Sequence, residues 1–243
     1  MRYRELHPWN VSYKDAVSLQ EELRGQLIIR SLSEQPRLVA GADVSYSKLT
    51  ARVYAGVVIM DFGSMSIVEE ASATAEANFP YIPGLLSFRE APVLLKAFSR
   101  LDRVPDVVLF DGQGIAHPRG VGLASHMGLI LGKPSIGCAK KLLIGEHKPV
   151  GDKPGDFSYI LYKRRRIGAV LRTRGGVKPV FVSPGHKTDI ASSIRIVLNS
   201  CRRYRLPEPI RKAHNLVTIL RVSDEAEIKG IRHKNRFTAN TMG

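Results

Sequence analysis

Cysteine is scarce in this sequence, which has two, Cys138 and Cys201, among 243 residues. Their wide separation matches neither a zinc-ligand spacing nor a disulfide framework, so a disulfide-rich secreted domain is excluded. Long apolar runs are missing too, because none approaches the ~18 residues that span a membrane. The opening MRYRELHPWN has no apolar signal-peptide core. The sequence therefore predicts a cytoplasmic protein with no membrane partner.

Acidic residues are also few, since 22 Asp and Glu stand against 37 Lys and Arg, for a formal net charge of +15. This excess favours a polyanionic partner, and nucleic acid is a commoner one than an acidic membrane surface. The 44% share of hydrophobic residues is enough to bury a core, which excludes a disordered chain. The composition predicts a folded, basic protein that binds nucleic acid.

Several catalytic signatures are absent. The sequence has no G-x-x-x-x-G-K-[ST] loop for nucleoside triphosphates and no G-x-S-x-G elbow of a serine hydrolase. His-x-x-Glu-His and Cys-His zinc spacings do not occur either. Gly112-Gln113-Gly114 is a weak match to a dinucleotide fingerprint. Glycines there would instead let a ligand or metal approach the backbone closely.

Hydrophobic periodicity predicts three consecutive strands and then an alternation of helices and strands. Short polar or glycine links between the first three strands favour antiparallel neighbours. The pattern is typical of an α/β domain with a mixed sheet and helices on its faces. Strands are expected over 37–46, 52–63, 64–77, 106–110, 134–139, 157–163, 166–172 and 179–184, and helices over 11–31, 84–99, 119–131 and 189–201.

The chain contains no linker, internal repeat or low-complexity tract, so residues 1–243 are expected to form a single domain. The run KRRR at Lys163–Arg166 falls between two predicted strands and is expected to form a hairpin tip. The last residues, 229–243, contain no acid and little apolar content. They are expected to form a mobile basic tail.

Acidic residues occur at two positions where a charge is costly to bury. Asp43 interrupts the apolar strand LVAGADVSY, and Asp111 ends the strand DVVLF. Each alone could be a turn or N-cap residue, but two acids at strand ends of one sheet can converge on a divalent cation. Glu90 is a third candidate, although a lone glutamate near a helix start is most often on the surface. Hard oxygen ligands suit Mg²⁺ or Mn²⁺, so we interpret the chain as a metal-dependent nuclease.

Four stretches of the sequence resemble endonuclease V, the family of deoxyinosine 3′ endonucleases. They are GADVSY at Gly41–Tyr46, NFPYIPGLLSFRE at Asn78–Glu90, DGQGIAHPRGVGLASHMG at Asp111–Gly128 and PSIGCAKK at Pro134–Lys141. Weaker matches follow, in the right order, at Val182–Ile190 and Leu206–His214. The second and third stretches are the most specific.

The resemblance implies an RNase H-like fold, in agreement with the mixed sheet and flanking helices indicated by the periodicity. It implies that metal-activated water hydrolyses the second phosphodiester bond 3′ to a deaminated purine, leaving 3′-hydroxyl and 5′-phosphate ends. The expected partner is DNA containing deoxyinosine, and relatives also act on inosine in RNA. The expected cofactor is Mg²⁺, for which Mn²⁺ can substitute.

Positions that match the family's motifs carry its catalytic roles as expectations. By this match Asp43, Asp111 and Glu90 bind the metal. Lys140 matches a lysine near the scissile phosphate, where a compact cation can balance the charge of the transition state. His214 matches a further catalytic residue.

The resemblance also implies a wedge that inserts beside the damaged base. Tyr81 matches its aromatic residue, whose ring can stack in the gap left by a base rotated out of the helix. Pro80, Ile82 and Pro83 complete the wedge, and the two prolines would stiffen it.

A base pocket and its supporting residues are expected in the same motifs. The flipped hypoxanthine would lie against Gly84, Leu86 and Gly112, where backbone groups can reach the base edge. Arg89 is expected to hold the carboxylates or contact phosphate. His117 is expected from the resemblance to support the site, although a histidine in this pattern would by itself more often cap or brace its own loop.

Two other functions stay open. A structure-selective nuclease of the same fold would use the acids but disregard inosine, and the wedge motif argues against it. A noncatalytic inosine-RNA binder would be expected to lack an acid or the lysine, yet Asp43, Glu90, Asp111 and Lys140 are all present. Nothing in the sequence indicates an obligate dimer, so a monomer is expected.

Overall fold

The computed structural model describes residues 1–240, with side chains described as far as residue 230. The strands of these residues form one eight-stranded sheet in the order β3-β2-β1-β4-β5-β8-β7-β6. The strands are β1 (Leu38–Tyr46), β2 (Arg52–Asp61), β3 (Ile67–Glu76), β4 (Val107–Phe110), β5 (Ser135–Ala139), β6 (Phe157–Tyr162), β7 (Arg165–Leu171) and β8 (Val180–His186). The helices are α1 (Tyr13–Arg24), α2 (Leu86–Ser99), α3 (Leu123–Leu131), α4 (Ile190–Asn199) and α5 (Glu208–Asn240).

The sheet is mixed, as the sequence predicts. β4 is parallel to β1 and to β5, and the remaining neighbours are antiparallel. Helix α2 lies on the connection from the β1–β3 meander to β4, and α3 connects β4 to β5, as parallel pairs require. The arrangement confirms the expected RNase H-like mixed sheet with flanking helices.

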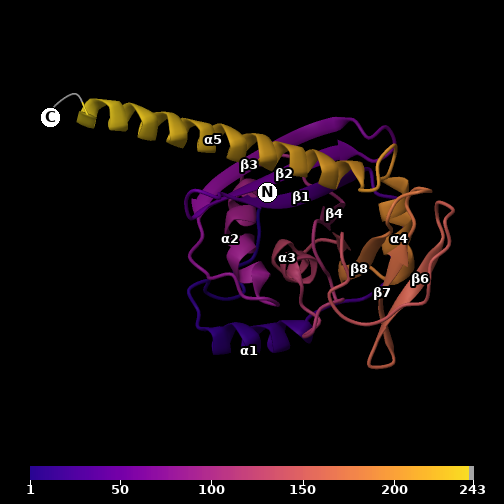
Figure 1. Cartoon of the computed structure of the whole chain (residues 1–243). Coiled ribbons are helices and arrows are strands. Elements are labelled where there is room, and N and C mark those ends of the chain that lie inside the picture. Colours follow the sequence, from indigo (N-terminus) through magenta and orange to yellow (C-terminus); the bar gives the residue numbers. More distant parts are fainter. Residues whose placement is uncertain (241–243) are drawn as a thin grey trace.

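Helices cover both faces of the sheet, which places the core in two layers (Figure 1). Leu94 of α2 and Met127 of α3 belong to the cluster on one face. Ile196 of α4 and Ile210 of α5 belong to the cluster on the other. Successive residues of β2 are buried on alternate faces, so this strand is covered on both sides.

Three helices differ from the expectations. Helix α3 begins at Leu123 and not at residue 119, because Gly120 adopts a φ of +76°, which a helix does not allow. Helix α1 ends at Arg24 and not at residue 31, because the chain turns at Gly25, whose amide donates to the Glu22 carbonyl at 3.0 Å. Helix α5 has no counterpart among the expected elements, and Figure 1 shows its far end projecting beyond the sheet. Residues 229–240 of the expected tail continue this helix, whereas residues 241–243 lie outside the described residues. The mobility of this segment stays a prediction.

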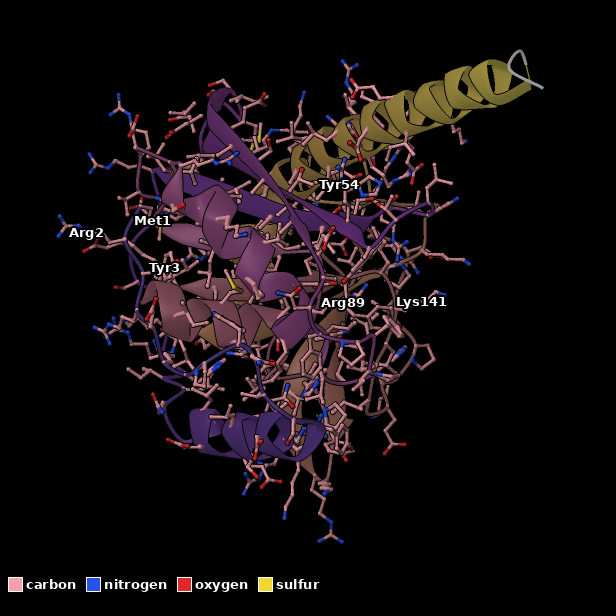
Figure 2. The ribbon with its side chains drawn as sticks, turned by 90° about the vertical axis from the view of Figure 1, so that its left-hand side faces the viewer. Met1, Arg2, Tyr3, Tyr54, Arg89 and Lys141 are labelled. Carbon is pink, nitrogen blue, oxygen red and sulfur yellow. The ribbon has the colours of Figure 1, made fainter. Side chains whose placement is uncertain are left out.

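Cys138 and Cys201 are free thiols, and Cys138 is buried. Within residues 1–240, no helix combines the length and the hydropathy needed to cross a membrane. Met1 and Lys141 lie on opposite sides of the molecule in Figure 2. The N-terminus is therefore remote from the end of β5, where the candidate site begins.

Candidate active site

Two neighbouring parallel strands bring the two aspartates together. Ala42 of β1 is in register with Phe110 of β4, and an aspartate follows each of them. The amide of Asp111 donates to the Ala42 carbonyl at 3.2 Å, so the pairing continues to the aspartate itself. The parallel pairing of β1 with β4 stops just before the two aspartates, although β1 itself continues to Tyr46. Ligands of open α/β sheets bind outside the carboxyl ends of such strands. Asp43 and Asp111 therefore share one site.

Helix α5 brings His214 to the same site. Its Nδ1 lies 2.7 Å from Oδ2 of Asp43. The helix can approach this closely because β1 presents Gly41 to its first turn. A Cβ on Gly41 would lie 2.0 Å from the carbonyl carbon of Pro209, a distance that no side chain tolerates. The absence of a side chain at Gly41 thus lets α5 pack against β1, and this packing places His214 beside Asp43.

Lys140 extends the site toward solvent. It follows β5, the parallel neighbour of β4, and its Nζ donates to Oδ2 of Asp111 at 2.5 Å. The lysine side chain is 40% exposed, so a substrate phosphate can reach the ammonium. The pair places a positive charge directly beside the acids.

Asp43, Asp111 and His214 can form a cation-binding group, because each can bring one ligand atom within 4.8 Å of the others. Burial, with a smaller contribution from repulsion by Asp111, raises the pKa of Asp43 to about 6. A divalent cation would relieve both the burial penalty and the repulsion. Two carboxylates and an imidazole are donors that divalent cations accept, so the residues present fit a divalent metal.

Glu90 lies beside the cation-binding group and is not one of its three members. Its Oε1 accepts a 2.6 Å hydrogen bond from the hydroxyl of Tyr46. Burial raises the pKa of Glu90 to about 7, and the charges of Asp43 and Asp111 contribute to the rise. Glu90 is therefore close enough to respond to the aspartates, and its role as a metal ligand stays a prediction.

A cavity of about 530 Å³ opens onto these residues. Its wall combines residues expected for the wedge, the base pocket and the chemistry: Tyr81, Pro83, Gly84, Leu86, Glu90, Asp111, Gly112, His117 and Lys140. A mostly apolar cavity with a few polar groups is typical of a site for a flat ligand such as a base. Asp111 both lines the cavity and belongs to the cation-binding group, so it joins the two.

The four expected wedge residues face different surroundings. Tyr81 is 66% exposed at the mouth of the cavity, where it can meet a substrate. Ile82 instead packs inward against the cluster that contains Phe88. Pro80 is exposed and lines a separate cavity of about 440 Å³, whereas Pro83 lines the same cavity as Tyr81. Ile82 thus anchors the loop from which Tyr81 projects.

Gln20 of α1 is a residue that the sequence motifs miss. Its buried amide donates to the carbonyls of Gly84 at 3.1 Å and Val121 at 2.9 Å, and its oxygen accepts from Nε of Arg119 at 2.6 Å. The Gly84 carbonyl also receives Nη2 of Arg119 at 2.8 Å and faces Nε2 of His117 at 3.0 Å. Gly84 adopts a φ of +80°, which glycine tolerates best. No sequence motif includes Gln20, which looks like any polar residue of an amphipathic helix. Its importance becomes visible only in the structure, where its side chain is buried and bonded to Arg119.

His117 and Arg89, the two residues expected to support the site, each bond to a backbone carbonyl of a loop. His117 fixes the Gly84 carbonyl, and burial, followed by the nearby charge of Arg119, lowers the pKa of His117 to about 4. Arg89 donates from Nη1 to the Phe79 carbonyl at 2.5 Å, and its guanidinium lies 5.1 Å from the Tyr46 ring. Both residues hold the loop that carries Tyr81.

Known proteins resemble this chain over most of its length. The family model described as Endonuclease V matches residues 21–215. An Endonuclease V of Methanothrix thermoacetophila is 49% identical over 216 residues, which cover 89% of this chain and 95% of the relative.

Solved structures show the same likeness. The crystal structure of Endonuclease V from Streptomyces avermitilis is 38% identical with a TM-score of 0.85, covering 93% of this chain and 100% of that one. Endonuclease V of Ciona intestinalis, solved with a 24mer DNA containing an inosine followed by a ribo-adenosine, is 27% identical with a TM-score of 0.74. That alignment covers 90% of this chain and 98% of the relative.

Proposed function

This chain belongs to the endonuclease V family, and we propose that it hydrolyses the second phosphodiester bond 3′ to deoxyinosine in DNA. The products would carry 3′-hydroxyl and 5′-phosphate ends. The observation that carries the proposal is the shared cavity wall, where Gly84, Leu86 and Gly112 lie beside Asp111 and Lys140. A base bound in the cavity would bring its flanking phosphates next to the acids and the lysine. The inosine-containing DNA held by the Ciona relative supports DNA as substrate.

The family's nucleases need a divalent metal, and we propose Mg²⁺, with Mn²⁺ as a substitute. Asp43 and Asp111 would hold it, with His214 or Glu90 completing the donor set. When bound, the metal supplies Lewis acidity and a more acidic water at neutral pH. Two carboxylates in one site are the feature of this chain that favours such a cation.

The chain's own residues position the phosphate and balance its charge. Lys140, now paired with Asp111, would stabilise the negative charge that develops on the cleaved phosphate. Asp43 holds Nδ1 of His214, which leaves Nε2 as the ring nitrogen that can face water or phosphate. The imidazole side chain is 49% exposed, so the substrate strand can reach it.

Lesion recognition would depend on the wall of the cavity and on the wedge. Tyr81 would stack into the gap left by the flipped nucleotide. The side chains of Gln20, His117 and Arg119 all contact the Gly84 carbonyl. These contacts would hold the loop rigid, so that it would not adapt to a base of another shape. A rigid pocket of backbone groups can read the N1–H and O6 pattern of hypoxanthine, which adenine lacks.

The proposal also covers domain organisation, oligomeric state, cellular compartment and a second substrate. We propose a single domain, residues 1–243, that acts as a monomer in the cytoplasm. The free thiols of Cys138 and Cys201 support a reducing compartment. Inosine in RNA is proposed as a second substrate.

The test is cleavage of end-labelled oligonucleotides that carry one inosine, as duplex and single strand, in DNA and in RNA. Matched adenine strands serve as controls, with Mg²⁺ and with EDTA. Metal-dependent cutting one nucleotide beyond inosine, absent from the controls, is the expected result, and the relative rates rank DNA against RNA.

Other outcomes would replace the proposal. Cutting of inosine and adenine strands at equal rates would make the protein a structure-selective nuclease. Tight inosine binding without cutting in any divalent metal would make it a noncatalytic binder.

A further inference from the structure

The outer face of the edge strand β6 carries exposed apolar side chains. Phe157, Tyr159 and Leu161 alternate along the strand and are 45%, 36% and 40% exposed, whereas Ile160 is buried. β6 is the last strand of the sheet, and within residues 1–240 its one strand neighbour is β7. With residues 146–148, these side chains line a cavity of about 580 Å³. We call this cavity the β6 groove.

The β6–β7 hairpin that lines the β6 groove is basic. Residues 157–171 contain four basic residues and no acid. The guanidinium of Arg166 lies 4.2 Å from the centre of the Tyr159 ring, and His147 and Lys148 line the groove beside Glu146, its one acidic lining residue. Aromatic rings and guanidinium planes are the surfaces on which bases of a single strand stack, and cations bind its phosphates. The chemistry of the groove therefore fits a single-stranded nucleic acid.

The hairpin beside the groove has an unusual turn. The predicted tip is a two-residue loop, Lys163-Arg164, with φ of 50° and 63°. Asn and Gly are the residues usual at such a turn, because longer side chains are disfavoured at positive φ. Lys163 and Arg164 in this conformation place two positive charges side by side at the tip.

A single loop connects the β6 groove to the proposed active site. Glu146 follows Lys140 by six residues and forms a bridge with Leu161 of β6, through N–O distances of 2.9 and 2.8 Å. Six residues span at most about 20 Å. Stacked nucleotides advance about 3.4 Å each, so a strand would cover this distance in about six nucleotides.

We propose that the β6 groove binds a single-stranded part of the substrate strand, at a distance of several nucleotides from the bond that is cut. A base stacks among Phe157, Tyr159 and Arg166, and neighbouring phosphates lie near Lys148 and the hairpin tip. This inference rests on the proposed function, because the strand is the one that enters the neighbouring cavity.

The test measures binding of fluorescein-labelled single-stranded DNA by fluorescence polarisation in EDTA. A strand of about 20 nucleotides with a central inosine is long enough to reach both sites. An inosine-centred pentanucleotide reaches only the proposed active site. Tyr159→Ala is expected to weaken binding of the long strand at least about 5-fold, since one stacked base commonly contributes that much, and to leave the short strand unaffected.

Two further variants serve as controls. Tyr159→Phe keeps the ring and is expected to bind the long strand like the wild type. Tyr13→Ala removes a tyrosine of α1 that is 59% exposed and lies outside both sites, so it should change neither affinity.

Several results would overturn the inference. Wild-type affinity of Tyr159→Ala for the long strand is one, and an equal loss in Tyr13→Ala is another. A loss of the same size on the short strand would show that Tyr159 acts through the active site. A concentration-dependent dimer that Tyr159→Ala dissociates would assign the face to a second copy of the chain.

The proposed function and the β6 groove can fail separately. Because binding is measured without metal, a lack of inosine cleavage would leave this experiment informative. If the protein cleaves inosine DNA normally but binds the long and the short strand with equal affinity, the proposal for the groove alone is refuted.

Discussion

Nδ1 of His214 lies 2.7 Å from Oδ2 of Asp43, although 171 positions separate the two residues in the sequence. The contact joins α5 to the centre of the sheet at the point where the second aspartate, Asp111, also ends its strand. The candidate metal site is therefore complete only when α5 is packed against the sheet.

Replacement of Asp43 should separate cutting from binding. Asp43→Ala removes a carboxylate of the cation-binding group, so we expect cleavage of inosine DNA to fall at least about 100-fold, as for loss of a main charge-stabilising group. Binding of the same DNA should persist, because the cavity wall is untouched. Single-turnover cleavage and polarisation binding measure the two. Asp61→Ala, at the last residue of β2 and outside the candidate site, is the matched control, and full activity of Asp43→Ala would refute the metal site.

Replacement of His214 should weaken the response to metal. In His214→Asn the Asp43 carboxylate loses its imidazole partner, and we expect the Mg²⁺ concentration for half-maximal cleavage to rise about 10- to 100-fold. A titration of cleavage rate against Mg²⁺ checks this. Asn215→Ala, on the next residue of the same helix, should leave the titration unchanged. An unshifted titration in His214→Asn would remove the histidine from the site.

Replacement of Tyr81 should reduce discrimination more than chemistry. The ring is 66% exposed, so Tyr81→Ala leaves the fold intact but removes the group that would stack beside the lesion. We expect the ratio of kcat/KM for inosine and adenine strands to fall at least about 5-fold. Tyr81→Phe should retain the ratio. Identical ratios in wild type and Tyr81→Ala would contradict the wedge role.

Replacement of Gln20 should loosen the base pocket. Gln20→Met keeps the volume but removes two donors and the acceptor of Arg119 Nε, at an expected loss of about 1–3 kcal/mol in unfolding free energy. KM for inosine DNA should rise while kcat changes less, because the Gly84 loop is proposed to contact the base and the acids stay in place. Urea unfolding and steady-state kinetics measure both. Gln26→Met, at an exposed position, is the control, and an unchanged KM would limit Gln20 to stability.

Acid should destabilise the fold through buried neutral histidines. Burial, with a smaller effect of His7, lowers the pKa of His126 from 6.5 to about 3. Between these pH values the unfolded chain binds a proton that the folded chain does not. The stability is therefore full above about pH 6.5 and is lost as pH falls toward 3, by up to a few kcal/mol. Urea unfolding at pH 7 and at about pH 4.5 measures the loss.

His126→Gln should make this pH dependence smaller. It should not abolish it, because His117, with a pKa of about 4, titrates in the same direction. An equal loss of stability in wild type and His126→Gln would show that other groups cause the acid sensitivity.

Much of the sheet could be predicted because strands leave a local signal. Periodicity correctly places the apolar strands around Asp43 and Asp111. The run of cations correctly marks the turn between β6 and β7. The limits of α1 were less predictable, because Gly25 ends the helix through local hydrogen bonds while the apolar spacing continues. Helix α5 escaped prediction because, within residues 208–230, its buried apolar side chains Ile210, Ala213 and Val217 are confined to its first turns.

The sequence by itself determined the mixed α/β class, the basic surface, and the two aspartates that end or interrupt apolar strands. These features depend on composition and on residues close together in the chain. Only the tertiary structure decided that Asp43, Asp111 and His214 form one group, that Glu90 faces Tyr46, and that Gln20 holds the Gly84 loop. These contacts join residues far apart in the chain, and the packing of α5 against Gly41 and of α1 against the loops brings them together.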